Sequence, residues 1–325
     1  MYRLAIALLL FGVFLPQNVA YAQASVAPLT VDIAPENPRP YQTITVTPGS
    51  TLIDLSASTI TVTLNGKVVM KGSGAASVPI TIGGPGERTT VVVSATLNGQ
   101  TYTKELIFRP GDVALVVEPI SSAHPFYAGG ALTSPQGRVR VVAIPDLRTN
   151  ATTRIPPQNL VYIWKFGNKI LQENSGIGKS VLVATAPPRY RDAQLTVTVS
   201  SQDSTTVAEA STVVNPVDPI VRLYPNDPLF GPDFDHALSS TLALEGSEES
   251  FRGVAYFFGA TPTLSWSVNN QPSGNEKDVT VRTTGTGPGT ASLSFTASNS
   301  VTHQTVTRPL TVSFGGKKGT NLFGF

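Results

Sequence analysis

Hydrophobic and polar residues alternate along the chain in short runs separated by turn residues, a pattern typical of β-strands with one face in a core. Three such runs end in a polar turn, at residues 60–66, 162–168 and 264–270. Val62, Trp164 and Trp266 hold the same place in these runs, and both steps between them are 102 residues. A further alternating run follows each turn, at residues 91–95, 195–199 and 293–297. The chain therefore contains a tandem repeat.

This repeat predicts an all-β fold of three tandem immunoglobulin-like antiparallel β-sandwiches, each about 100 residues long. The expected divisions are a signal peptide at 1–22, sandwiches at 23–112, 113–216 and 217–315, and a flexible basic and aromatic tail at 316–325. Proline at both links, near residues 109–112 and 215–219, limits backbone freedom and favours a semi-rigid array. Asn65-Gly66 predicts a two-residue hairpin turn.

One interval departs from the period. Tyr41 and Tyr127 follow similar proline-containing segments, yet they are only 86 residues apart. The difference indicates an insertion in the second repeat or a deletion in the first.

The N-terminus has the organisation of a secretory signal. Arg3 precedes an apolar run from Leu4 to Leu15, and Ala20-Tyr21-Ala22 fits a cleavage site before Gln23. An uncleaved anchor is the alternative. No later segment is apolar enough to span a membrane as a helix, so we expect an extracytoplasmic location: secreted, periplasmic or on the cell surface.

Composition narrows the function. Charged residues make up 14% of the chain, the net charge is +2 and the basic residues are scattered, which argues against nucleic-acid binding. With no cysteine, the chain lacks thiol nucleophiles and cysteine metal sites, and an exported fold must be held by packing alone. No Gly-x-Ser-x-Gly motif occurs, and His124, His236 and His303 lie far apart. We therefore expect no catalytic residues.

The segment Tyr162-Ile163-Trp164-Lys165-Phe166-Gly167-Asn168, followed by a proline turn and an alternating strand, resembles bacterial immunoglobulin-like modules of the PKD type. The usual acidic turn is replaced by Asn168-Lys169, and the first repeat has no tryptophan. The resemblance implies an extracytoplasmic β-sandwich used for spacing, adhesion or binding, without shared catalytic residues.

Trp164 and Trp266 are predicted to be core residues, because alternation places them on the apolar face of their strands. Exposed sugar-stacking platforms are the alternative. The opposite face of the Trp164 strand carries Val161 and Ile163, so we expect another segment to cover it, with residues 146–158 as the candidate.

One carboxylate cluster suggests a metal. Asp227, Asp233 and Asp235 share a loop and could converge on Ca²⁺, although the Asp-x-Asp-x-Asp-Gly pattern is absent. The alternative is a loop of ordinary Asx turns. No other cofactor is expected.

Two aromatic segments are candidate partner sites. Tyr256-Phe257-Phe258 cannot all face one side of a strand, so Phe257 either packs beneath a loop or against the second domain, or forms an exposed contact. In the tail, Leu322, Phe323 and Phe325 suggest a short docking peptide, with a frayed end as the alternative.

Together these features predict a non-catalytic exported protein of the envelope or medium that acts as a spacer, adhesion or assembly module. Its expected partner is an envelope protein or a surface polysaccharide. The alternatives are a carbohydrate-binding protein with aromatic platforms, and a non-catalytic subunit of a secretion or pilus-like machine.

Overall fold

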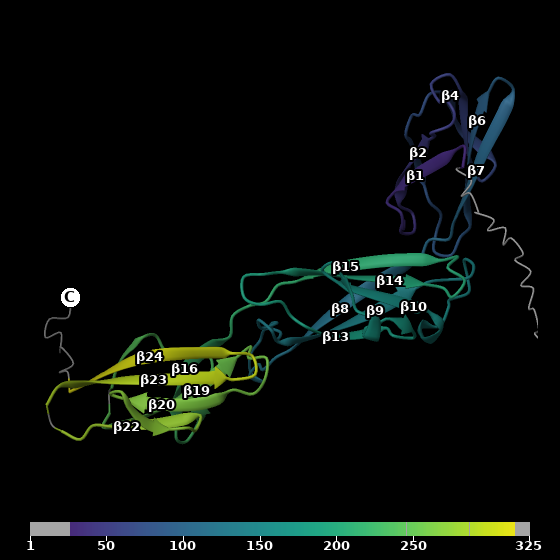
Figure 1. Ribbon diagram of the computed structural model, residues 1–325. Helices are drawn as coiled ribbons and strands as arrows, with labels where there is room; N and C mark the ends of the chain where they lie inside the picture. The colour runs from purple at the N-terminus through teal and green to yellow at the C-terminus, as the bar shows by residue number, and fades with distance from the viewer. Residues whose placement is uncertain (1–26, 245, 286, 316–325) are drawn as a thin grey trace, which may run out of the picture.

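The computed structural model describes residues 27–244, 246–285 and 287–315, which form β-strands arranged in three successive bodies (Figure 1). The described residues contain no α-helix, only two short 3-10 turns, η1 (Pro157–Asn159) and η2 (Gln172–Asn174). Accordingly, none of them belongs to a helix able to cross a membrane. The signal segment, residues 1–22, and the tail, residues 316–325, lie outside the described residues.

The first sandwich packs a three-stranded sheet, β1-β2-β5, against a four-stranded sheet, β4-β3-β6-β7. Their bounds are β1 (Thr30–Ala34), β2 (Thr43–Gly49), β3 (Thr59–Leu64), β4 (Lys67–Ser73), β5 (Val78–Thr81), β6 (Thr89–Leu97) and β7 (Gln100–Phe108). Alternate residues of β2, β3 and β6 are buried between the sheets, which accounts for the period of two in the sequence.

The second sandwich repeats this plan, with sheets β13-β9-β8 and β11-β10-β14-β15, and β12 also pairs with β10. Its strands are β8 (Asp112–Ile120), β9 (Arg138–Asp146), β10 (Val161–Phe166), β11 (Lys169–Ile170), β12 (Gly176–Ile177), β13 (Val181–Thr185), β14 (Ala193–Ser200) and β15 (Val207–Val214).

The third sandwich has sheets β17-β16-β19-β22 and β18-β24-β23-β20-β21, in which β18 runs parallel to β24. Its strands are β16 (Ile220–Asp227), β17 (Gly231–Pro232), β18 (Thr241–Ala243), β19 (Glu248–Tyr256), β20 (Thr263–Val268), β21 (Gln271–Gly274), β22 (Asp278–Arg282), β23 (Gly289–Asn299) and β24 (Gln304–Phe314).

The predicted tandem immunoglobulin-like fold is confirmed by equivalent strands in the three sandwiches. Val62, Trp164 and Trp266 lie on β3, β10 and β20, and all are buried. Each of these strands pairs with the alternating strand predicted to follow it: β6, β14 or β23. The hairpin turn is confirmed as well, because Asn65 and Gly66 have φ values of 48° and 82°.

The segment expected to cover Val161 and Ile163 lies elsewhere, so that prediction is wrong. Ile163 remains 40% exposed. The loop after β9 is instead tied to itself, since Arg148 makes two hydrogen bonds to the Asp146 carboxylate, and it packs against the first sandwich. There a Cβ on Gly86 would lie 2.5 Å from the carbonyl oxygen of Asn150.

Candidate binding site between the second and third sandwiches

The second sandwich contacts the third through the long segment that joins β8 to β9, residues 121–137, which we call the connector. Residues 35–42 suffice for the same connection between β1 and β2. The equivalent connection in the third sandwich, residues 228–247 between β16 and β19, is also long, so the short Tyr41-to-Tyr127 interval reflects a deletion in the first repeat. Ser122 fixes the start of the connector to the third sandwich: its N–H donates to the Phe258 carbonyl at 3.0 Å, and its carbonyl accepts from the Phe257 N–H at 2.6 Å.

The connector is needed because the β16-β19 sheet has apolar residues on both faces. Leu223 faces the sandwich core, whereas its neighbour Tyr224 belongs to a second buried cluster with Val254, Tyr256 and Phe257. Tyr127 of the connector contacts this cluster, with its ring centroid 5.6 Å from that of Tyr256. The hydroxyl groups of Tyr224 and Tyr256 are 2.9 Å apart, so both are hydrogen-bonded despite their burial.

The expectation that Phe257 forms an exposed contact is wrong, because its side chain is only 3% exposed. Phe257 has a φ of 64°, which breaks the alternation just after β19 ends at Tyr256. This turn lets Phe258 enter the same core as Trp266 while Phe257 meets the Tyr127 ring edge-on at 5.5 Å. Phe257 instead packs against the second domain, which is the alternative that the sequence offered.

Polar contacts complete the junction. The buried Gln304 amide donates to the Pro135 carbonyl at 2.8 Å, and the Val217 N–H donates to the Thr133 carbonyl at 2.7 Å. Gly137 and Gly259 allow close approach here, since a Cβ on Gly259 would lie 3.0 Å from the Gly137 Cα. The second and third sandwiches are thus joined by backbone, side-chain and aromatic contacts in addition to the link itself.

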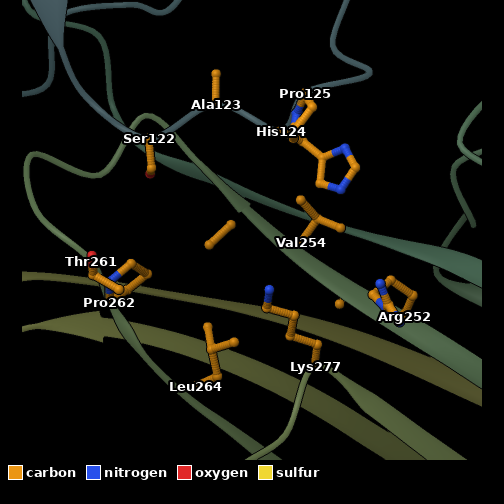
Figure 2. A pocket seen from close by; sticks show the side chains of 12 residues that line it. Ser122, Ala123, His124, Pro125, Arg252, Val254, Thr261, Pro262, Leu264 and Lys277 are labelled. Atoms are coloured by element: carbon orange, nitrogen blue, oxygen red, sulfur yellow. The ribbon is translucent and has the colours of Figure 1, made fainter.

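A pocket of about 270 Å³ opens beside the connector (Figure 2). Its lining residues are Ser122, Ala123, His124 and Pro125 of the connector, and Arg252, Gly253, Val254, Ala255, Thr261, Pro262, Leu264 and Lys277 of the third sandwich. The His124 ring and the Lys277 side chain enter from opposite sides, with Val254 between them (Figure 2). Arg252 forms an ion pair with Asp278, and no carboxylate of the described residues lines the pocket.

His124 links the pocket to the aromatic cluster. Its ring centroid is 4.2 Å from that of Phe234 and 5.4 Å from that of Phe126. Burial, then the positive charges of Arg252 and Lys277, lower the pKa of the His124 imidazole below its ordinary value of 6.5. His124 is therefore neutral at pH 7.

The junction should lose stability on acidification. Because the folded protein holds the His124 proton more weakly than the unfolded chain does, protonation favours unfolding as the pH falls through 6.5. Protonation of His236 has the opposite effect on stability. Its hydrogen bond with Asp233 raises the pKa of the imidazole, and the resulting stability is lost as the pH rises. In urea titrations between pH 5 and 8, His124→Gln should reduce the fall in the free energy of unfolding at acid pH, and His236→Gln should increase it. Two identical profiles would contradict the assignment.

The calcium interpretation is not supported by the loop geometry. Asp227 accepts hydrogen bonds from the N–H groups of Leu229 and Phe230, and Asp233 accepts from the Asp235 N–H. These are Asx turns, the alternative that the sequence offered. Across residues 27–244, 246–285 and 287–315, no group of three or more His, Cys, Asp or Glu side chains is placed to hold a metal ion. Thus Asp227, Asp233 and Asp235 are not brought together as ligands.

The remaining sequence candidates divide into two sets. Trp164 and Trp266 are core residues, as predicted, and His303 is exposed in a turn. The tail residues Leu322, Phe323 and Phe325 lie outside the described residues. The pocket itself had no sequence signal beyond the 86-residue interval, because its walls come from four separated segments.

Comparison with known protein families gives no match, and none is found among curated proteins. Among solved structures, the fibronectin(III)-like modules of Clostridium thermocellum CbhA align with 58% of this chain and 93% of theirs, at 10% identity and a TM-score of 0.27. The central fibronectin-III array of RIM-binding protein aligns with 87% of this chain and 94% of its own, at 11% identity and a TM-score of 0.28. Sidekick-1 immunoglobulin domains 1–5 align with 88% of this chain and 58% of theirs, at 11% identity and a TM-score of 0.30. No enzyme family is indicated. On its own strand order, the chain is a tandem array of immunoglobulin-like sandwiches.

Proposed function

We propose that this protein is an exported, non-catalytic spacer that holds binding surfaces at fixed positions for adhesion or assembly in the cell envelope or medium. The observation that carries the proposal is the connector, which locks the second sandwich to the third through Ser122, Tyr127 and the Gln304–Pro135 hydrogen bond. A chain of freely jointed modules has no need of such contacts.

The first junction supports the same proposal. The Gly86 N–H donates to the Pro110 carbonyl at 2.9 Å, and Arg39 lies 3.8 Å from the Asp112 carboxylate. Only residues 109–111 separate β7 from β8. Short links and direct contacts at both ends of the second sandwich favour an array that keeps its shape.

An exposed apolar row supports a role in assembly. Val116 and Val181 both pair with Val142, so the three side chains share one face of the β13-β9-β8 sheet. Val116 and Val181 are exposed and lie on the two edge strands of that sheet. Apolar side chains on sheet edges favour contact with another protein.

Export and binding can be tested together. Expression of the full-length chain in a bacterial host, followed by fractionation and N-terminal sequencing, should yield an extracytoplasmic protein beginning at Gln23. Envelope extracts and a polysaccharide panel should then be probed with the full-length chain and with a variant lacking residues 316–325, which include the proposed docking residues Leu322, Phe323 and Phe325. Recovery in the cytoplasm with Met1 retained would contradict export, and equal recovery of partners by both forms would contradict tail docking.

A further inference from the structure

The geometry points to the pocket beside the connector as a binding slot for an extended peptide that carries apolar and acidic side chains. The slot would accept this segment from a partner protein as a short additional strand along β19. The inference rests on the proposed function in one respect, since it assigns a partner class to the assembly role.

The first observation is an unfinished strand edge. β22 pairs with β19 from Glu248↔Arg282 to Arg252↔Asp278, and the Gly253 N–H then donates to the Lys277 carbonyl at 2.8 Å. Beyond this bond, β19 continues to Tyr256 with no paired strand on the β22 side within the described residues.

Ala255 presents its backbone on this open side. Alternate residues of a strand direct their N–H and C=O groups to the same side, so Ala255 points as Gly253 does, towards the line that β22 would follow. Ala255 also lines the pocket, together with Gly253 and Val254. A strand edge that is open over Val254–Tyr256 spans roughly 10 Å, which matches about three peptide residues.

The second observation is the enclosure of that edge. Ser122–Pro125 of the connector border one side of the pocket, and Pro262 and Leu264 border another. The volume of about 270 Å³ lies just below the ~300 Å³ at which small-molecule sites begin, so it holds a side chain with its backbone rather than a large ligand. The apolar walls favour a hydrophobic side chain.

The third observation is charge. Lys277 directs its amino group into the pocket, and no ion pair or hydrogen bond of this group is found with the described residues (Figure 2). Arg252 adds a second positive charge, although Asp278 balances it. Because none of the described carboxylates lines the pocket, an acidic side chain next to Lys277 would gain a charge-assisted hydrogen bond.

These observations favour a peptide over an acidic saccharide. A saccharide could use Lys277, but it has no backbone amides to pair with the open edge at Ala255. Among the described residues, no Phe, Tyr or Trp ring lines the pocket for a sugar to stack on; Phe126, outside the lining, is 74% exposed and lies against Phe234 at an interplanar angle of 28°.

The test is selection from a library of random hexapeptides displayed on phage, with the immobilised full-length chain as bait. We expect enrichment of sequences in which apolar and acidic residues alternate. The best synthetic hexapeptide should bind at least tenfold more weakly to Lys277→Glu in fluorescence anisotropy, and methylation of its backbone amides should abolish binding. Lys104→Glu, an exposed lysine on β7, is the matched control and should bind normally.

Several results would overturn the proposal: no enrichment, enrichment without acidic residues, or equal binding to Lys277→Glu. Displacement of the peptide by oligogalacturonate at comparable concentration would assign the pocket to a saccharide instead. If the protein is exported and rigid but selects no peptide, the peptide slot is refuted and the proposed spacer function stands. Unchanged melting temperatures of the variants would show that they fold.

Discussion

Replacing Trp164 with alanine is expected to lower the free energy of unfolding by about 3–5 kcal/mol, measured by urea denaturation. The side chain is 0% exposed at the centre of the second core, and its indole N–H donates to the Lys179 carbonyl at 2.9 Å. The variant would lose both a large buried surface and this hydrogen bond. Unchanged stability would refute the role of Trp164 as a core residue.

Trp266 provides the matched comparison. It occupies the equivalent position on β20, but its indole nitrogen is buried without a hydrogen-bond partner among the described residues. Trp164→Phe leaves the Lys179 carbonyl unpaired, whereas Trp266→Phe removes an unpaired donor. We therefore expect Trp266→Phe to lower the free energy of unfolding by about 1 kcal/mol less than Trp164→Phe does. The reverse order would contradict this account of the two cores.

Replacing Gln304 with leucine is expected to cost about 1–3 kcal/mol, because the buried Pro135 carbonyl loses the donor at 2.8 Å. The cost should appear at the junction, so thermal unfolding followed by calorimetry should separate the second and third sandwiches into two transitions. Gln100→Leu, on the exposed side of the first sandwich, is the control and should leave the profile unchanged. A single unaltered transition in Gln304→Leu would show that this contact does not couple the sandwiches.

The repeated fold was predictable from the sequence because strand alternation and turn chemistry are local. Trp164 and Trp266 mark equivalent strands, and Asn65-Gly66 specifies its turn without help from distant residues. Strand-level signals of this kind are present in each repeat. They were sufficient to predict an all-β tandem array.

The candidate site was less predictable because it depends on contacts between sandwiches. The positive φ of Phe257 redirects three successive aromatics into two clusters, which alternation alone does not reveal. Likewise, nothing local shows that the connector would cover Tyr224 and Tyr256, or that residues 146–158 would turn towards the first sandwich. The apolar second face of β16 and β19 was the available signal, but it was not decisive, because the similar second face of β10 leaves Ile163 exposed.

The central claim, that the connector fixes the third sandwich relative to the second, can be tested by one distance measurement. The chain has no native cysteine, so spin labels can be placed at Lys165→Cys on β10 and Ser265→Cys on β20, both exposed. Double electron–electron resonance on the full-length chain should give one narrow distance distribution, which Gln304→Leu combined with Tyr127→Ala should broaden. A broad distribution in the otherwise unmodified chain would contradict the claim.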